Sequence, residues 1–428
     1  MEFSVSDIAS LLLALTLLLG AAHGFGYLFR WMRQPPVIGE IMGGLLLGPT
    51  IFGYFFPELQ HAVFAGNAKT QTILGAIYQL GLLLLMFCSG GEIRATFQSG
   101  ERRTASLITL TGTAIPFALG VLFLRMIDAD AFVGAAGNET AFLLVFAIGV
   151  AVTSIPVISR ILHDLGILET DFARIILSAA VIEDVVLYVV LAVALSMVGT
   201  GPDQAFGVPA ALGLHDSAGA NIAYHSAITL VFFWLALLVG PAVFRWANRF
   251  RYNLVRKSSP VAHLLTFCLI MTGLAVFLGV APMFGAFVAG IVTGQSVDDA
   301  EMPRNAITTF SFAFFIPIYF AIVGLRLDLV RAFDPGFFLL FFAFACFVKA
   351  LSVYLGARAA GESHTGATNL SVAMNARGGP GIVLASLAFD AAIINESFYS
   401  ILVMLAIVTS LLAGSWLDRT VRSGMALR

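Results

Sequence analysis

The sequence contains very little charge. Only 11% of its 428 residues are Asp, Glu, Lys or Arg, whereas a soluble domain carries about 25%. A chain with so little polar cover cannot present a water-facing surface on all sides, which excludes a water-soluble enzyme, a nucleic-acid-binding protein and a disordered chain. The net charge of −2 offers no basic surface for nucleic acid. Hydrophobic residues make up 59% of the chain, so we expect lipid to be the solvent for most of it.

Cysteine is also scarce. The three cysteines, Cys88, Cys268 and Cys346, all lie inside apolar runs and show no Cys-X-X-Cys spacing. This pattern is typical of small core side chains and not of disulfides or metal ligands. We therefore expect neither a disulfide framework nor a resident cofactor.

Thirteen apolar runs have about the length that a bilayer requires, since its hydrocarbon core of ~30 Å needs about 20 residues of helix. They are continuous and not alternating, which favours helices over strands. The ninth run is short and can merge with the eighth. We therefore expect an all-α polytopic membrane protein of about 13 transmembrane helices. The runs are 8–29, 37–55, 73–90, 105–124, 141–162, 175–197, 222–244, 261–278, 282–292, 310–325, 337–355, 367–388 and 398–416.

The distribution of basic residues predicts the orientation. If the N-terminus is outside, seventeen of the 23 Lys and Arg residues fall in inner segments, and two lie within helices. The four in outer segments are Lys69, Arg125, Arg326 and Arg331. Because cytoplasmic loops carry the excess of Lys and Arg, we expect an external N-terminus and a cytoplasmic C-terminus.

The two halves of the chain have matching interruptions. With 222–247 as a linker helix, helices one to six begin outside and helices eight to thirteen begin inside, which predicts two inverted six-helix repeats. The fifth helix of the first half contains Thr153-Ser154-Ile155-Pro156, and that of the second half contains Asn375-Ala376-Arg377-Gly378-Gly379-Pro380-Gly381. Such paired breaks indicate crossing discontinuous helices and a binding site near the membrane midplane. The alternative is a pair of ordinary proline kinks.

Five charged residues lie well inside apolar runs, where each costs about 2.5–3.5 kcal/mol and needs a partner or a function. They are Glu40, Glu183, Asp184, Lys349 and Arg377. Glu183 and Asp184 are adjacent, so their side chains point about 100° apart on a helix and cannot share one partner in the same way. We expect Glu183 to pair with Lys349, which leaves Asp184 for a solute. The alternative is an ion cluster that only holds helices together.

A carboxyl group away from water exchanges its proton nearer neutral pH than a solvated one, and once ionised it is an oxygen ligand for a small monovalent cation. The cation and proton site is expected to consist of Asp184 and Glu183, completed by Thr153, Ser154 and backbone carbonyls of the broken helices. The supporting residues are Lys349, Arg377, Asn375 and Glu40.

Glu40 lies only a few residues from the inner surface. Its side chain is expected to reach that surface, to cap a helix or to take part in transport. In the same helix, Gly44 and Gly48 form a small-residue face suited to close packing.

These motifs together resemble the monovalent cation:proton antiporter superfamily, in the branch of bacterial sodium/proton and potassium/proton antiporters and plant cation/proton exchangers. The likeness is carried by Pro36-Val37-Ile38-Gly39-Glu40, Thr153-Ser154-Ile155-Pro156-Val157, Ala179-Ala180-Val181-Ile182-Glu183-Asp184-Val185, Phe315-Ile316-Pro317 and Asn375-Ala376-Arg377-Gly378.

The resemblance implies a homodimer in a bacterial inner (plasma) membrane, working by an elevator-like shift. Segments 1–91 and 261–330 would form the scaffold and dimerisation helices, and 100–200 and 335–418 the mobile core. Cation and proton would compete for Asp184, and Lys349 matches the family's lysine. Glu183 departs from the Asp, Asn or Gln often found at its position, and an acid there goes with electrogenic exchange. No cytosolic regulatory domain is expected.

Three functions compete. The first is a secondary antiporter that exchanges Na⁺ or K⁺ for protons, with monovalent cations, protons, the lipid bilayer and a second copy of the chain as its partners. The second is an ion-coupled carrier of an organic anion on a similar fold. The third is a membrane sensor or scaffold that transports nothing. The buried acids favour a cation, and the sequence shows no hydrolase or metalloprotease motif that would indicate an enzyme.

Overall fold

A computed structural model describes residues 4–92, 102–198, 206–213, 218–294 and 301–428. Within these ranges every regular element is a helix, and the one extended pairing is an isolated bridge between Val133 and Ile394. Among the described residues, ten helices are long and apolar enough to cross a membrane. The prediction of an all-helical membrane protein is confirmed. Positions 100 and 200, which bound the predicted core segment, lie outside the described residues.

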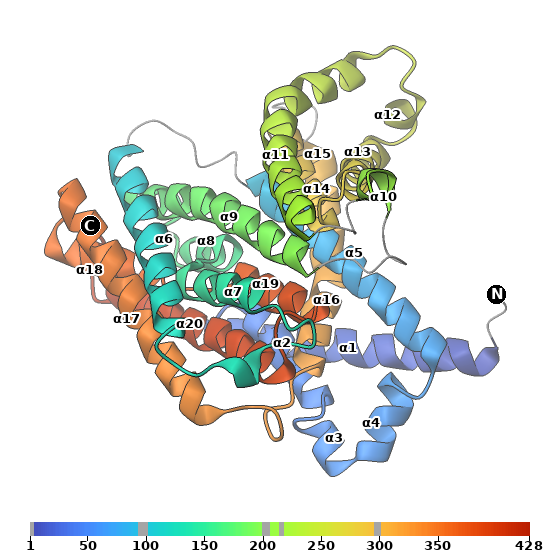
Figure 1. The fold of residues 1–428 in the computed structure, drawn as a ribbon, viewed down its shortest axis with the longest axis horizontal. Coiled ribbons are helices and arrows are strands. Elements are labelled where there is room, and N and C mark those ends of the chain that lie inside the picture. Colours follow the sequence, from blue (N-terminus) through green and yellow to red (C-terminus); the bar gives the residue numbers. More distant parts are fainter. Residues whose placement is uncertain (1–3, 93–101, 199–205, 214–217, 295–300) are drawn as a thin grey trace. The chain divides into compact units, whose positions relative to one another are not determined.

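The chain forms two compact units, which we describe separately. The first consists of residues 1–75, 98–191 and 320–428. Its helices are α1 (Val5–Trp31), α2 (Pro36–Leu47), α3 (Phe52–Phe55), α4 (Pro57–Phe64), α6 (Arg102–Leu124), the 3₁₀ turn η2 (Asp130–Phe132), α7 (Glu139–Ala151), α8 (Ile155–Asp164), α17 (Pro335–Ala360), α18 (His364–Ala373), α19 (Gly378–Asp390) and α20 (Glu396–Arg422) (Figure 1).

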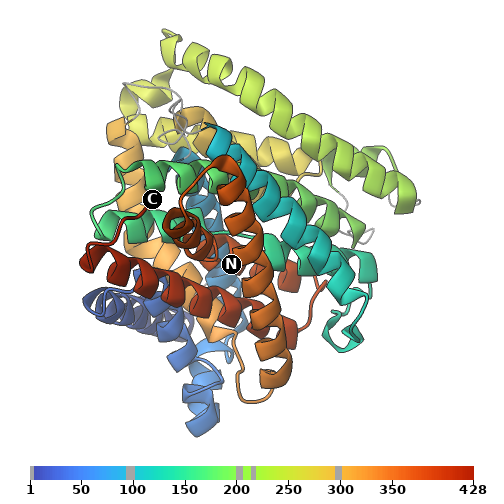
Figure 2. The same cartoon turned by 90° about the vertical axis from the view of Figure 1, so that its left-hand side faces the viewer.

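The second unit consists of residues 76–97 and 192–319. Its helices are α10 (Gly207–Ala211), α11 (Ala218–Arg249), α12 (Leu254–Ser258), α13 (Pro260–Phe277), α14 (Pro282–Gly294) and α15 (Glu301–Phe310), followed by a π-helical turn at Ser311–Phe315. Within this unit α14 packs against both α13 and α11 (Figure 2). Three helices run from one unit into the other: α5 (Ala68–Glu92), α9 (Asp171–Met197) and α16 (Ile316–Leu325).

Six helices of the first unit, α1, α7, α8, α17, α18 and α20, begin at a side chain that accepts a backbone N–H of the first turn. Ser4 and Asp7 form a reciprocal capping box at α1, Asp334 caps α17 and Asn395 caps α20. Such caps satisfy amide groups that have no partner inside the helix. The sequence therefore fixes where these membrane-spanning helices start.

The glycine face of α2 lets it pack closely on a neighbouring helix. A Cβ atom at Gly44 would lie 1.9 Å from the carbonyl oxygen of Ala321 in α16, and one at Gly324 would lie 2.0 Å from that of Ile41. Backbones this close leave no room for a side chain on either helix. The close packing predicted for the Gly44 and Gly48 face is present.

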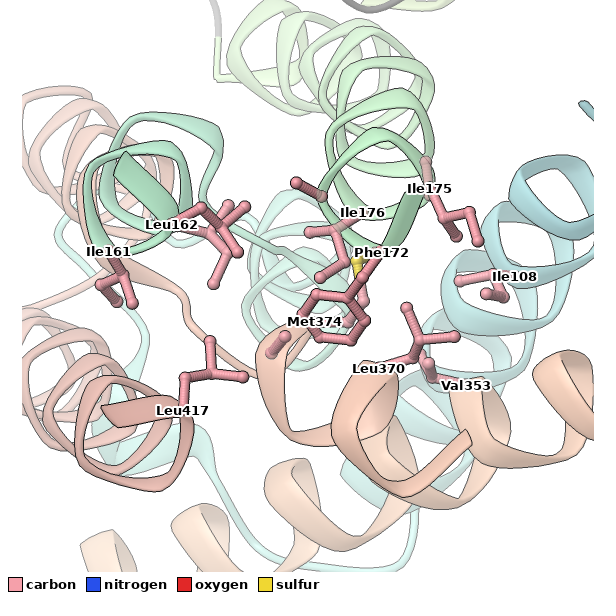
Figure 3. Close-up of a cluster of buried hydrophobic side chains, with 14 of the residues drawn as sticks. Ile108, Ile161, Leu162, Phe172, Ile175, Ile176, Val353, Leu370, Met374 and Leu417 are labelled. Atoms are coloured by element: carbon pink, nitrogen blue, oxygen red, sulfur yellow. The ribbon is translucent and has the colours of Figure 1, made fainter. Parts of the chain in front are cut away.

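A cluster of buried hydrophobic side chains joins six helices of the first unit (Figure 3). Phe172 of α9 and Met374, which follows α18, lie at its centre. Around them lie Ile108 of α6, Ile161 and Leu162 of α8, Ile175 and Ile176 of α9, Val353 of α17, Leu370 of α18 and Leu417 of α20. The cluster contacts both interrupted helices and thereby holds them beside α9.

Candidate functional site

The two predicted interruptions are present, and they contact each other. α7 ends at Ala151 and α8 begins at Ile155, while α18 ends at Ala373 and α19 begins at Gly378. The backbone N–H of Ser154 donates to the carbonyl oxygen of Ala376 at 2.6 Å, and the Thr153 hydroxyl donates to that of Met374 at 2.7 Å. The two breaks therefore satisfy each other's backbone groups, which non-helical backbone inside a membrane requires.

Where α8 and α19 begin, serine hydroxyl groups accept hydrogen bonds from backbone N–H groups that have no partner within the helix. Ser154 Oγ accepts from the backbone N–H of Val157 at 3.3 Å and of Gly379 at 3.1 Å. Ser410 Oγ of α20 accepts from the N–H of Gly378 at 3.1 Å. A Cβ atom at Gly378 would lie 2.8 Å from Ser154 Oγ, so this close approach needs glycine.

Sequence reasoning missed the contribution of α20. Besides Ser410, Thr409 accepts the backbone N–H of Arg377 through its hydroxyl at 3.4 Å. Both residues are buried. The available signal was two adjacent hydroxyl side chains in the middle of the last apolar run, where polar groups usually have a partner or a function.

Arg377 closes the C-terminal end of α7. Its guanidinium donates to the carbonyl oxygens of Gly149 at 3.2 Å and Val150 at 3.1 Å, and to that of Ala345 in α17 at 2.9 Å. It also donates to the side-chain oxygen of Asn375 at 3.0 Å. The last carbonyls of a helix lack partners and carry the negative end of its dipole. A buried cation at this point compensates both.

Lys349 and Glu183 form a fully buried ion pair, with 2.7 Å between Nζ and Oε1 and no exposure of either side chain. Lys349 Nζ also donates to the carbonyl oxygen of Gly112 in α6 at 2.8 Å and to that of Ala151, the last residue of α7. The structure therefore brings together the two residues that the sequence analysis paired. Their contacts join α6, α7, α9 and α17.

Asp184 follows Glu183 in α9 and is 1% exposed. Neither of its carboxylate oxygens has a hydrogen-bond partner among the described residues, and the same holds for Oε2 of Glu183. The nearest charges that act on Asp184 are Glu183 and Lys349, and Tyr188 lies one turn further along the same helix. Thr153 lies beside the Glu183 carboxyl group. These groups form a buried set of oxygens at the crossing.

Buried polar groups almost always have a partner, because a carboxyl group without one bears the whole cost of leaving water. A bound proton or a small cation can supply that partner. Hard oxygen ligands such as carboxylate, hydroxyl and carbonyl groups are those that hard cations prefer. The carboxylate of Asp184, whose two oxygens have no partner among the described residues, can therefore hold either a proton or a small cation.

Glu40 occupies a different environment. Its side chain lies against Gly26 of α1, is 8% exposed and has no hydrogen-bond partner for Oε2 within the described ranges. The start of α2 has no side-chain cap, so the expectation that Glu40 caps this helix is wrong. At 8% exposure, the side chain does not extend into water either. The contact recorded for its side chain is with Gly26 of α1.

Almost the whole chain is similar to known proteins. Residues 14–423 match the family described as "Sodium/hydrogen exchanger, transmembrane". The chain is 28% identical to the Na⁺/H⁺ antiporter NhaS4 of Synechocystis, over 95% of this chain and 96% of that protein. It is 28% identical to cation/H⁺ antiporter 18 of Arabidopsis thaliana and 29% identical to K⁺/H⁺ antiporter 1 of Saccharomyces cerevisiae. The chain spans only 45% and 43% of the length of these two relatives.

The fold is also that of a solved antiporter. The structure of the sodium/proton antiporter MjNhaP1 from Methanocaldococcus jannaschii superposes with a TM-score of 0.65, covering 96% of this chain and 99% of that one, at 14% sequence identity. This agreement confirms the predicted antiporter-like fold with crossing discontinuous helices. The chain is an integral membrane protein and belongs to the transmembrane sodium/hydrogen exchanger family.

Proposed function

We propose that the protein is a secondary active antiporter that exchanges a monovalent cation, Na⁺ or K⁺, for protons, and that both ions compete for the carboxylate of Asp184. The observation that carries the proposal is the contrast between two adjacent buried acids. Glu183 has a counter-charge at 2.7 Å, whereas both oxygens of Asp184 have no partner among the described residues. A proton or a cation on Asp184 removes this imbalance, and the two cannot occupy the same oxygens together.

The hydrogen bonds at the crossing indicate which neighbours can serve as further cation ligands. Thr153 uses its hydroxyl proton on Met374, which leaves its oxygen lone pairs free. Ser154 Oγ already accepts two backbone amides, so both of its lone pairs are occupied. We therefore propose Thr153 as a cation ligand beside Asp184, and Ser154 as the residue that holds the starts of α8 and α19 in place.

Lys349 and Arg377 act as positioning residues in this proposal. The ammonium group of Lys349 neutralises the charge of the Glu183 carboxylate. Asp184 is then the acid whose charge changes when a proton or a cation binds. Arg377 fixes the end of α7 through carbonyl oxygens on two helices, and Asn375 holds its guanidinium in place. The same contacts weigh against transport of an organic anion, because the buried guanidinium that could bind a carboxylate is already bound to carbonyl groups.

We further propose that residues 100–200 and 335–418 move as a core against a scaffold of 1–91 and 261–330. In support, the crossing joins the helices of the core to one another, while glycine faces join α2 to α1 and α16 within the scaffold. A homodimer in a bacterial inner membrane, with an external N-terminus and a cytoplasmic C-terminus, completes the proposal. The excess of Lys and Arg in inner segments supports the orientation.

The test uses the full chain in proteoliposomes that hold a pH gradient. Na⁺, Li⁺ and K⁺ are added in turn, and a pH-sensitive dye follows the collapse of the gradient. Asp184→Asn removes the charge while keeping the shape of the side chain. Asp128→Asn is the matched control, because this loop carboxylate only accepts the backbone N–H of Asp130, which an amide oxygen can also do.

At least one cation should collapse the gradient with the wild type and Asp128→Asn but not with Asp184→Asn. Normal exchange by Asp184→Asn would exclude competition at this carboxylate. If no monovalent cation acts on folded, correctly inserted wild-type protein, the antiport proposal is wrong and the organic-anion carrier becomes the next function to test.

A further inference from the structure

A second polar site does not include Asp184. It lies where α1, α8 and α20 end and α2 begins. It is a cavity of about 570 Å³, a size typical of small-molecule sites. Arg30, Arg33, Gln34, Arg422 and Asp418 provide its polar lining, and the remaining lining residues are Pro35, Ile161, Leu165, Gly414 and Val421. We call this cavity the arginine pocket.

The arginine pocket has an excess of positive charge. Its single carboxylate, Asp418, serves two of the three arginines, with Arg422 Nε at 2.9 Å and the nearest Arg33 nitrogen at 3.7 Å. A guanidinium group has five N–H donors in a planar fork. Asp418 therefore leaves most of the donors in the pocket available, in the geometry that binds phosphate through paired hydrogen bonds.

The backbone at Arg33 supports a role for its side chain. Arg33 has a φ of 59°, in the left-handed region that glycine adopts easily and other residues rarely adopt. It ends α1: its N–H donates to the carbonyl oxygen of Arg30 at 2.9 Å, and that of Gln34 donates to Phe29 at 2.8 Å. Glycine is the usual residue in such a helix end. An arginine at a position that favours glycine raises the question of what its side chain binds.

The surroundings of the pocket fit a membrane lipid. Trp31 is 75% exposed and Met32 52% exposed, directly before Arg33 at the end of a membrane-spanning helix. An exposed tryptophan at such a helix end is typical of the interface between lipid and water. Gln34 donates to Ser415 at 3.1 Å through its amide nitrogen, but its buried oxygen has no partner among the residues that the structure describes. A hydroxyl group of a lipid headgroup can donate to that oxygen.

We propose that the arginine pocket binds the phosphate group of an anionic membrane lipid with a hydroxylated headgroup, such as phosphatidylglycerol. The guanidinium groups of Arg30, Arg33 and Arg422 hold the phosphate oxygens, Gln34 accepts a headgroup hydroxyl, and the acyl chains lie along Trp31 and Met32. The lipid thereby bridges the turn after α1 to the end of α20. This inference does not depend on the proposed transport function.

The experiment measures lipid binding and thermal stability of the full chain in detergent micelles, by native mass spectrometry and by thermal unfolding. The probes are phosphatidylglycerol, phosphatidylcholine and inorganic phosphate. Arg33→Gly removes one guanidinium and places glycine where the backbone favours it, so the variant is expected to fold. Arg249→Gln is the matched control, because Arg249 is an exposed arginine in the last turn of another membrane-spanning helix, α11.

Phosphatidylglycerol should bind to and stabilise the wild type and Arg249→Gln, and binding to Arg33→Gly should be about tenfold weaker, as expected for the loss of one charge-assisted contact. Phosphatidylcholine should have no such effect. Equal binding of phosphatidylglycerol to Arg33→Gly and the wild type would exclude the pocket as the site. Equal stabilisation by inorganic phosphate and phosphatidylglycerol would exclude a lipid as its ligand.

Discussion

Replacing Lys349 by methionine tests the buried ion pair directly, because methionine keeps most of the side-chain volume and removes the charge. The change leaves Glu183 without its counter-charge at 2.7 Å and the carbonyl oxygen of Ala151 without its donor. Breaking one partner of a buried pair costs about 3–5 kcal/mol, and an orphaned carbonyl group at a helix end adds about 1 kcal/mol. At roughly 1 °C per kcal/mol for a chain of this size, the Tm should fall by about 5 °C.

The double variant Lys349→Met with Glu183→Gln separates the charge effect from simple loss of packing. With both charges removed, the remaining cost is that of the altered hydrogen bonds, so about half of the lost Tm should return. Lys69→Met is the matched control, since Lys69 and Asp7 have the same 2.7 Å separation but the lysine side chain is 51% exposed. An exposed pair contributes little to stability, so this variant should unfold close to the wild-type temperature.

The assay is thermal unfolding of the purified chain in detergent, followed by tryptophan fluorescence. Two results would refute the reasoning. One is a Tm for Lys349→Met within about 1 °C of the wild type, which corresponds to no more than about 1 kcal/mol in a chain of this size. The other is a double variant whose loss of Tm equals the sum of the two single losses, since this would mean that the two side chains do not interact.

Three further predictions concern other parts of the first unit. Asp184→Asn should unfold at the wild-type temperature or above in the absence of cations, because the amide avoids burying a charge without a partner; added cation should raise the Tm of the wild type only. Gly44→Ala should lower the free energy of unfolding by about 1–3 kcal/mol, because the added methyl group clashes with Ala321. Gly20→Ala places its methyl group in open space on α1 and should raise the free energy of unfolding by about 0.5–1 kcal/mol. Denaturant titration of both variants measures the two changes. Arg377→Lys should lower the Tm, because an ammonium group lacks the planar fork with which the guanidinium donates to α7 and α17 at once, and an unchanged Tm would contradict the capping role.

Local patterns in the sequence were sufficient to predict the membrane-spanning helices and the two interruptions. Apolar runs of bilayer length predict spanning helices because lipid leaves backbone groups no partner outside the helix. Two of the thirteen predicted runs, 141–162 and 367–388, are pairs of short helices in the structure, α7 with α8 and α18 with α19. Their interruptions were visible as Thr153-Ser154-Ile155-Pro156 and as the glycine-rich stretch after Arg377.

The charged residues inside apolar runs could also be identified from the sequence, but the residues that they contact could not. Lys349 and Glu183 stand out in the sequence because each would be too costly to bury alone. The expectation that Glu40 caps α2 was wrong, because nearness to a membrane surface along the chain does not determine what lies beside the side chain. In the structure Gly26 of α1 lies against Glu40, and only the packing of α1 on α2 decides that.

The sequence by itself determined that the chain is a helical membrane protein, that two helices are broken and that five charged residues within the apolar runs are buried, because each of these follows from composition and local order along the chain. Only the tertiary structure decided that Arg377 closes α7, that Thr409 and Ser410 serve the start of α19, and that Arg30, Arg33 and Arg422 line one cavity. These contacts join residues far apart in the chain, and neither periodicity nor spacing specifies which helices will be neighbours.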